Sequence, residues 1–465
     1  MATDNGGNHQ RPHQTDAPGT QPERGAAERF SNYGFILAAI GSSVGLGNMW
    51  KFPYITGLYG GGAFVLLFIL SLVVIGLPVL LAELAIGRGG RGSPSASMAR
   101  LSGRRAWGGF GFLSIAGAFI IMSYYAVVAG WTLHYAALSL SGRLFATNDY
   151  AGTFDRFVSS YLPVFWQFVV MALTVWVVAR GVSGGIERFN RVLIPGLVIL
   201  LLVLVVRALT LPGAVEGVRF FLQPDFTSIK PVAVLVALGH AFFSLSLAMG
   251  CMMTYGAYVR KEQSLGTATL AIGGGDVLYA LLAGLIIFPT TAAFGIANQQ
   301  GPGLVFVALP AAFDSMPFGA WVGGLFFLLL AIAALTSAFS ILEVPVAFVL
   351  ERTGMGRRRA ASLVGVLVFL IGLPSALSAG GAVKGLELGG RSFFDWMDFT
   401  ASNVLLPVGG IIVTLFAGYA WKRAGEEAGV TAGWLRLWMF LLRYVAPVLI
   451  LLVFLYLTGV FGRPE

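Results

Sequence analysis

Charged side chains and cysteine are both scarce in this chain of 465 residues. Asp, Glu, Lys and Arg together make up 11% of it, and Cys251 is its only cysteine. Soluble domains carry about 25% charged residues, so the low charge, the 57% hydrophobic residues and the mean hydropathy of +0.81 exclude an ordinary soluble protein. The single cysteine excludes an intrachain disulfide. The composition indicates a polytopic membrane protein.

Motifs for covalent or ATP-driven chemistry are also missing. The sequence has no Walker loop and no G-x-S-x-G elbow, and His9, His13 and His134 do not have the spacing of metal ligands. The net charge of +9 comes from basic residues in short loops between apolar runs, which is typical of membrane orientation signals. We therefore expect no enzyme activity, no catalytic residue and no nucleic-acid partner.

Eleven apolar runs are long enough to cross a bilayer, which takes about 20 residues for each helix. The polar stretch 1–29 precedes them, and its composition predicts a disordered cytoplasmic tail. Lys and Arg concentrate in the loops that are cytoplasmic if the N-terminus is inside, which predicts a multi-pass protein of the plasma (inner) membrane with a cytoplasmic N-terminus. The predicted spans are 34–57, 62–87, 107–138, 161–181, 191–210, 231–258, 270–295, 317–350, 361–379, 396–420 and 436–460.

The first span contains a stretch that a lipid-facing helix has no reason to carry. Gly41 to Asn48 (GSSVGLGN) holds three glycines, two serines and an asparagine at mid-membrane. Glycine lets the backbone leave helical geometry, and irregular backbone at this depth survives only where it is buried in protein or lines a wet cavity. We interpret the span as a broken helix whose free carbonyls and amides face a binding site. Tight helix packing through small residues is the alternative.

The sixth span repeats this anomaly. Phe243 to Gly250 (FSLSLAMG) places two serines and a glycine at the midpoint of an apolar run. Two interrupted helices in corresponding positions predict an inverted-repeat transporter with its site at the interface of the repeats. Within a transporter domain at 30–465, the predicted repeats are 34–210 and 231–420, and 436–460 is an additional span.

Polar side chains inside the other spans are candidates for function because they are rare in that setting. Glu83, Asp276 and Glu343 are carboxylates within apolar runs, and Thr336 and Ser337 are adjacent hydroxyls. A hydroxyl can bond to its own helix backbone, so the two hydroxyls alone decide nothing. An unpaired carboxylate such as Asp276 is either protonated or holds a cation. Carbonyl, hydroxyl and carboxylate oxygens suit a hard cation such as sodium.

The run from Gly34 to Pro53 and the sequence Gly60–Phe64 (GGGAF) closely resemble the neurotransmitter:sodium symporter family. With the further matches, the resemblance covers roughly residues 30–420, and eleven spans are similar to its bacterial, LeuT-like amino-acid branch. It implies an all-α, LeuT-like fold: a 5+5 inverted repeat with unwound first and sixth spans, plus an eleventh span. It also implies sodium-coupled import of an amino acid by alternating access. The further matches are Tyr124-Tyr125, Trp131, Ala241–Gly250, Leu335–Ser337 and Asp395–Phe399.

Two sodium sites follow from the resemblance. In the first, the substrate carboxylate would join the Ser43 carbonyl and the side chains of Asn48, Ser244 and Asp276. The second would consist of three backbone carbonyls and two hydroxyls, those of Gly41, Val44, Ala333, Thr336 and Ser337.

The resemblance also implies how a substrate is held. Its carboxylate would meet the amides near Leu46 and Gly47 and the hydroxyl of Tyr125. Monoamine carriers of the family have Asp where this chain has Gly45, so the substrate must bring its own carboxylate, and the apolar lining favours a neutral, hydrophobic amino acid. The remaining substrate-site residues are Ser42, Phe243, Ser244 and Ser246 for the amine, and Ile121, Phe243, Met249, Ser337 and Ile341 around the side chain.

Four residues correspond to gates of the family. Lys51 and Asp398 would form the outer gate, where relatives pair Arg with Asp, and His240 stands where a Gln is expected. At the inner gate the expected Trp is missing, and Phe30 stands one residue nearer the first span. Glu351 would pair there with Arg24 or Arg29, both of which are available in the tail.

Two other functions stay open at this point. A proton-coupled amino-acid carrier of the same architecture would titrate Asp276, Glu83 or Glu343, whereas Asn48 and the hydroxyls at 336–337 favour sodium. A non-transporting receptor or an intramembrane enzyme would need a sensor domain or a paired nucleophile and base, and the sequence shows neither. The oligomeric state does not follow from the sequence.

We expect transport to be independent of chloride. Ala280 stands where animal members of the family bind chloride, and Asp276 supplies a fixed negative charge nearby. Replacing gluconate by chloride in an uptake assay should therefore leave the rate unchanged. Faster uptake in chloride would contradict this expectation.

Overall fold

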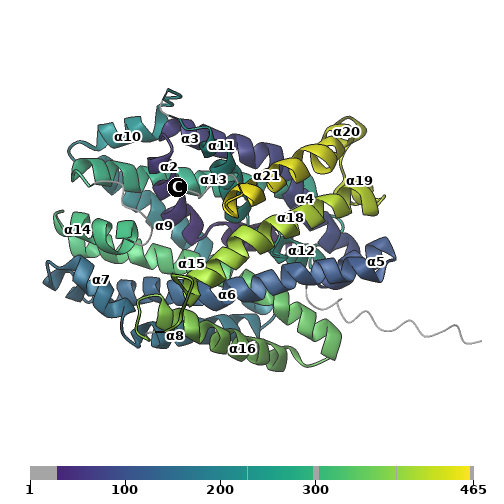
Figure 1. The fold of residues 1–465 in the computed structure, drawn as a ribbon, viewed down its shortest axis with the longest axis horizontal. Helices are drawn as coiled ribbons and strands as arrows, with labels where there is room; N and C mark the ends of the chain where they lie inside the picture. The colour runs from purple at the N-terminus through teal and green to yellow at the C-terminus, as the bar shows by residue number, and fades with distance from the viewer. Residues whose placement is uncertain (1–28, 228, 297–302, 384, 461–465) are drawn as a thin grey trace, which may run out of the picture.

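The protein, as seen in a computed structural model that describes residues 29–227, 229–296, 303–383 and 385–460, is a bundle of helices (Figure 1). The predicted disordered tail, 1–29, lies outside the described residues except for Arg29. Within the described ranges, a hairpin of Glu387–Leu388 (β1) and Arg391–Ser392 (β2) is the one sheet, and it pairs antiparallel. The expected all-α membrane fold is confirmed.

Eight helical runs among the described residues are long and apolar enough to cross a membrane, and a ninth counts if α7 (Tyr150–Val158) and α8 (Leu162–Val178), bent by 74°, form one span. The eight are α3–η2–α4 (Gly62–Ser71, Leu72–Gly76, Leu77–Gly90), α6 (Arg105–Leu140), η4–α9 (Val182–Glu187, Arg188–Leu209), α13 (Leu265–Ala293), α15 (Gly319–Thr353), α16 (Arg357–Ser378), α17–η6–α18–η7 (Phe393–Asp398, Phe399–Leu405, Leu406–Leu415, Phe416–Ala420) and α20–η8–α21 (Ala432–Phe440, Leu441–Val445, Ala446–Leu457).

Besides α8, whose 17 residues pass this test only together with α7, the two expected spans that are too short are the two that the sequence predicts to be broken. The first consists of α1 (Asn32–Ser43), η1 (Gly47–Lys51) and α2 (Phe52–Leu58). The sixth consists of α11 (Val232–Ser244) and α12 (Cys251–Ala257). The prediction of unwound first and sixth spans is confirmed.

The two breaks have different backbone geometry. At the first, Val44 is extended, with φ −76° and ψ 105°, so the helix ends without a left-handed residue. At the second, Ser246 and Ala248 both have positive φ, 53° and 68°, and Gly250 follows at 80°. Left-handed backbone costs energy for residues other than glycine, so contacts around the second break must stabilise this conformation.

Short helices lie at both ends of the bundle (Figure 1). One end, which we call the inner end, carries α5 (Pro94–Ser102) and α19 (Ala424–Ala428) and matches the loops that the sequence predicts to be cytoplasmic. The opposite, outer end carries α7 and α14 (Leu309–Asp314). The remaining short elements are η3 (Arg143–Ala146), α10 (Ala214–Leu222) and η5 (Leu304–Ala308).

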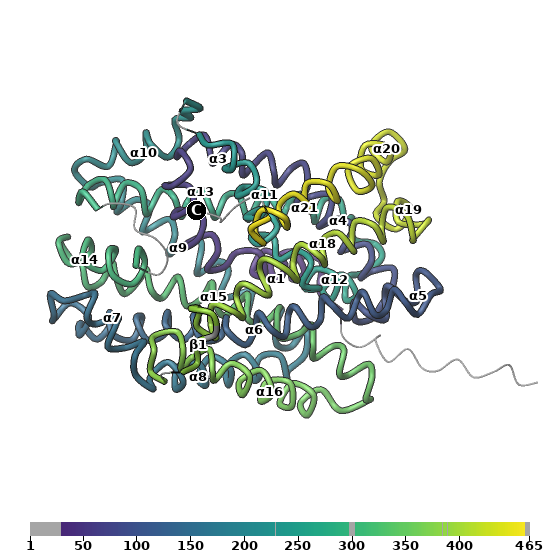
Figure 2. The backbone as a smooth tube through the Cα atoms, in the orientation of Figure 1, coloured from purple at the N-terminus to yellow at the C-terminus, as the bar shows by residue number. Residues whose placement is uncertain are grey.

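The broken first span lies in the middle of the bundle, where α1 contacts α9, α13 and α15 (Figure 2). The second half of the broken sixth span, α12, packs on α4 with their backbones close together. A Cβ at Gly87 would lie 1.9 Å from the Met253 carbonyl oxygen, and one at Gly256 would lie 2.6 Å from that of Leu84. Small residues on both helices therefore allow this contact, as is common between membrane helices.

We expect Gly87→Ala to destabilise the protein because backbone on α12 occupies the space that its methyl group needs. Overpacking of this kind typically costs about 1–3 kcal/mol, which a thermal-unfolding midpoint of the purified protein would report. Gly274→Ala is the matched control: Gly274 is an exposed glycine of α13, where nothing lies within 4 Å of an added Cβ. Equal midpoints for the two variants would contradict the packing argument.

Candidate functional site

Three of the residues predicted for the first ion site form one buried cluster between the two breaks. The Asn48 Nδ2 donates to Ser244 Oγ and to Asp276 Oδ1, at 2.9 Å in each case. The Ser244 hydroxyl donates in turn to the Asp276 carboxylate at 2.8 Å. The fourth residue, Ser43, is buried at the end of α1, and its hydroxyl donates back to the Ile40 carbonyl. The cluster joins η1, α11 and α13.

The residues predicted for the second ion site also come together. Ser337 Oγ, on α15, lies 3.4 Å from the Gly41 carbonyl oxygen, 3.3 Å from that of Val44 and 3.2 Å from that of Ala333. Thr336 Oγ1, on the same helix, donates to the Ala333 carbonyl at 3.0 Å. Free carbonyls at the first break therefore face the two hydroxyls of α15, in a set made only of oxygens.

The predicted carboxylate-binding segment is closely confined by its neighbours. A Cβ at Gly45 would lie 2.7 Å from Ser337 Oγ and 3.6 Å from Tyr125 Oη, and one at Gly47 would lie 2.8 Å from the Phe243 ring. Tyr125 Oη is buried and has no hydrogen-bond partner in the described part of the chain. The glycines thus leave backbone amides and one unpartnered hydroxyl facing the same space.

The two breaks are also linked to each other. The Ser246 hydroxyl, expected to meet the substrate amine, donates to the Ser42 carbonyl at 2.8 Å, and the Ser42 hydroxyl donates to Ser340 Oγ at 2.8 Å. Around them, the side chains predicted to line an apolar pocket are buried or partly buried: Ile121, Phe243, Met249 and Ile341.

Glu83 has a role that the sequence pattern alone does not show. Its Oε1 accepts a hydrogen bond of 2.6 Å from the Ala248 amide, so α4 holds the left-handed segment of the sixth span. Its Oε2 has no partner among the described residues. The available signal was only a carboxylate within an apolar run, because its partner is a backbone group of another span.

Comparison with known proteins identifies this arrangement. The profile of the Sodium:neurotransmitter symporter family matches residues 28–152 and 154–463. The chain belongs to this family. Membership makes it a multi-pass membrane transporter rather than an enzyme, and it confirms the resemblance that the motifs indicate.

Relatives of this transporter align over nearly its whole length. The uncharacterized sodium-dependent transporter YhdH of Bacillus subtilis is 40% identical over 441 residues, which covers 92% of this chain and 97% of the relative. An uncharacterized sodium-dependent transporter of Haemophilus influenzae is 36% identical over 437 residues, which covers 90% and 96%. The crystal structure of MhsT in complex with L-phenylalanine superposes with a TM-score of 0.85 at 44% identity, covering 92% of this chain and 99% of that one. This likeness confirms the LeuT-like fold.

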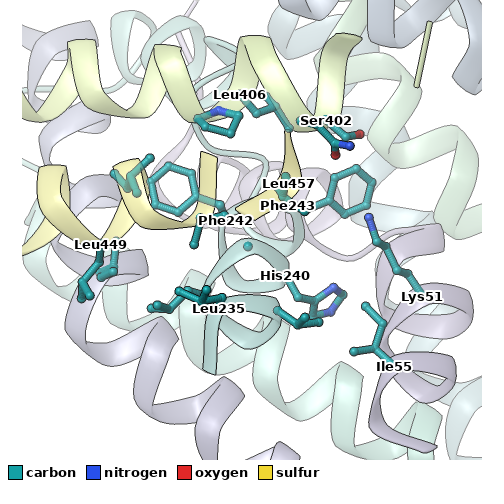
Figure 3. Close-up of a pocket in the computed structure, with 18 residues that line it drawn as sticks. Lys51, Ile55, Leu235, His240, Phe242, Phe243, Ser402, Leu406, Leu449 and Leu457 are labelled. Atoms are coloured by element: carbon teal, nitrogen blue, oxygen red, sulfur yellow. The ribbon is translucent and has the colours of Figure 1, made fainter. Parts of the chain in front are cut away.

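The predicted outer-gate residues of the transporter are not paired in this structure. Among the described residues Lys51 and Asp398 form no ion pair: Lys51 Nζ lies 4.8 Å from the centre of the Phe243 ring, and Asp398 accepts a hydrogen bond from Ser402. A cavity of about 90 Å³ lies beside Lys51, lined also by His240, Phe243 and Ser402 (Figure 3). His240 is buried against Phe52 and Phe68. Closure of this gate in another state stays a prediction.

The inner-gate prediction needs a correction. Glu351 pairs with Arg100 of α5 and accepts a hydrogen bond of 3.0 Å from the Ser93 amide, so it does not pair with Arg29. The other proposed partner, Arg24, lies outside the described residues. The sequence could not show this because Arg100 and Glu351 are 251 residues apart and meet only when α5 packs beside the end of α15.

Other contacts also close the inner end. Phe30 is fully buried, with its ring centre 5.2 Å from that of Tyr255 and 6.3 Å from that of Tyr258. Tyr258 donates to buried Glu343 at 2.9 Å, and Glu343 forms an ion pair of 2.5 Å with Arg357. Phe30 therefore packs at the inner end against Tyr255 of α12 and Tyr258, the residue that caps this helix.

We expect Gly45→Ala to abolish uptake or reduce it at least about tenfold, because the added methyl group would push the Ser337 hydroxyl away from the carbonyls it faces. A tenfold loss corresponds to about 1.4 kcal/mol. Uptake into proteoliposomes would measure it, with Gly196→Ala as the control, since nothing lies within 4 Å of a Cβ there. Unchanged uptake by Gly45→Ala would show that transport does not require the close contact between Ser337 and the first break.

Proposed function

We propose that this transporter is a sodium-coupled symporter that imports a neutral, hydrophobic amino acid by alternating access. The observation that carries the proposal is the convergence of buried oxygens from the first break, α13 and α15. Carbonyl, hydroxyl and carboxylate oxygens in this setting suit a hard cation, which supports sodium as the coupling ion. Among the described residues, no group of three or more His, Cys, Asp or Glu side chains is placed to hold a metal ion, which also fits sodium.

Two sodium ions are proposed. Asp276 is fully buried, and its side-chain partners among the described residues are the neutral groups of Asn48 and Ser244. A buried carboxylate without a basic partner is expensive unless it is protonated or bound to a cation, which supports the first ion there. The second ion would take the carbonyls of Gly41, Val44 and Ala333 with the hydroxyls of Thr336 and Ser337.

The substrate would lie across the first break. η1 begins at Gly47, and the start of a helix favours negative charge, which supports a carboxylate at the amides near Leu46 and Gly47 with the Tyr125 hydroxyl as a further donor. The amine would face the carbonyls near Ser42 and Phe243. Two observations support an apolar side chain: the buried lining residues, and the 44% identical MhsT, whose crystal structure holds L-phenylalanine.

The difference between the two ends supports alternating access. Buried Phe30 and the Glu351–Arg100 pair close the inner end. At the outer end Lys51 lies beside a cavity and forms no ion pair with Asp398 among the described residues. Rocking of the predicted repeats, 34–210 against 231–420, would exchange these states, with 436–460 outside the movement and the N-terminus in the cytoplasm. Because sodium and the substrate carboxylate would share a site, each should tighten the binding of the other.

A proton-coupled carrier of the same architecture is the second candidate. The observation in its favour is Glu83, whose Oε2 is buried without a partner among the described residues. Glu343, by contrast, is ion-paired with Arg357, which makes it a poor proton carrier. Uptake that persists without sodium and follows an imposed pH gradient would favour proton coupling. Loss of this uptake in Glu83→Gln would assign the coupling proton to Glu83.

The proposal predicts amino-acid binding that requires sodium. Purified protein should bind a neutral, hydrophobic amino acid in sodium and not in potassium, and Asn48→Ala and Thr336→Ala should each weaken binding at least about tenfold, which corresponds to 1.4 kcal/mol. Binding by a panel of labelled amino acids would measure this effect and rank the substrates.

Thr414→Ala is the matched control, because the hydroxyl of this buried threonine of α18 donates only to the Ile411 carbonyl, as that of Thr336 does to Ala333. Its binding should equal that of the unaltered protein. Equal binding in sodium and potassium would contradict sodium coupling and favour the proton-coupled carrier.

A further inference from the structure

We propose that a basic pocket between α8 and α16 binds the phosphate group of an anionic phospholipid from the leaflet around the inner end. The pocket has a volume of about 480 Å³. Its position on the cytoplasmic side rests on the orientation given under the proposed function, whereas its chemistry rests on the residues alone. It is lined by Ala179, Arg180, Gly356, Arg357, Arg358 and Arg359.

The protein balances the charge of this pocket only in part. Four of its six lining residues are arginines, and none is acidic. Arg357 is held by Glu343 and by the Val178 carbonyl, at 2.5 and 2.9 Å. Arg180 stacks on Trp176 with its guanidinium carbon 3.5 Å from the ring centre. Arg358 and Arg359 are exposed and belong to no ion pair within the described residues.

The backbone adds positive potential at the same place. The 22-residue helix α16 begins at Arg357, its N-cap is Gly356, which has no side chain to accept the first amides, and its first turn contains no acidic residue. Free amides and the helix dipole favour an anion at a helix start, and cationic side chains there are unfavourable. Of the three consecutive arginines in this turn, Arg358 and Arg359 therefore gain most from an external anion that accepts hydrogen bonds from guanidinium and amide groups together.

The surroundings indicate a lipid rather than a free phosphate ion. The helices that form the pocket continue away from it with exposed apolar side chains: Leu173 and Trp176 on α8, and Leu363, Val366, Leu367 and Leu370 on α16. Such faces lie against acyl chains in a membrane. Trp176 stands beside the arginines, as an aromatic residue does at the level of the headgroups. Basic pockets between helices on the cytoplasmic side are suited to anionic lipid headgroups.

The test compares two charge-matched variants. Arg358→Gln combined with Arg359→Gln removes two pocket charges and leaves Arg357, which supports Glu343, in place. Arg104→Gln combined with Arg105→Gln removes two exposed arginines at the start of α6, outside the pocket. Native mass spectrometry of the purified full-length chain would be used to titrate phosphatidylglycerol, phosphatidylcholine and inorganic phosphate.

We expect the pocket variant to lose at least about tenfold in affinity for phosphatidylglycerol and the α6 variant to change by less than about twofold in the same affinity. Phosphatidylcholine should bind weakly to both variants, with equal affinity. Equal losses in the two variants would overturn the pocket assignment. Inorganic phosphate that binds as tightly as phosphatidylglycerol would overturn the lipid as its occupant. Sodium-dependent amino-acid binding by the same samples is measured separately. Failure of the symporter proposal is therefore distinguishable from failure of the lipid-site proposal. Intact amino-acid binding also shows that the variants are folded.

Discussion

The hydrogen bonding of unwound backbone inside the membrane is the constraint on which the rest of this structure depends. Lipid offers no partner for the amides and carbonyls that the two breaks release. Side chains of neighbouring spans supply these hydrogen-bond partners: Glu83 accepts from the Ala248 amide, and Ser246 donates to the Ser42 carbonyl. Some polar groups deep in the bundle therefore stabilise the unwound backbone of the two breaks. The carbonyls that face Ser337 are the ones that a ligand could use.

The same broken helices also connect the site to both ends of the molecule. Phe30 precedes α1 and is buried against α12, so the inner closure lies directly on the halves of the two broken spans. Lys51 lies in η1 and contacts Phe243 of α11, so the outer cavity borders the other halves. A change in the packing at either end would therefore act directly on the oxygens proposed to bind ion and substrate.

The arginines of the inner end divide into two groups. Arg100 and Arg357 are held by acidic partners, Glu351 and Glu343, and belong to the closed inner network. Arg358 and Arg359 line the same surface pocket as Arg357 and form no ion pair among the described residues. In the sequence all four are simply basic residues of cytoplasmic loops, so the positive-inside pattern predicts their side of the membrane and nothing about their different tasks.

The sequence by itself determined the membrane class, the two broken spans and the candidate carboxylate of Asp276, because glycines, serines and carboxylates within apolar runs are costly and stand out without any knowledge of packing. Only the tertiary structure decided which groups meet. Glu351 pairs with Arg100, and Glu83 finds the Ala248 amide. Such partners come from distant spans, and side-chain pairing across helices depends on how the whole bundle packs, which no local pattern specifies.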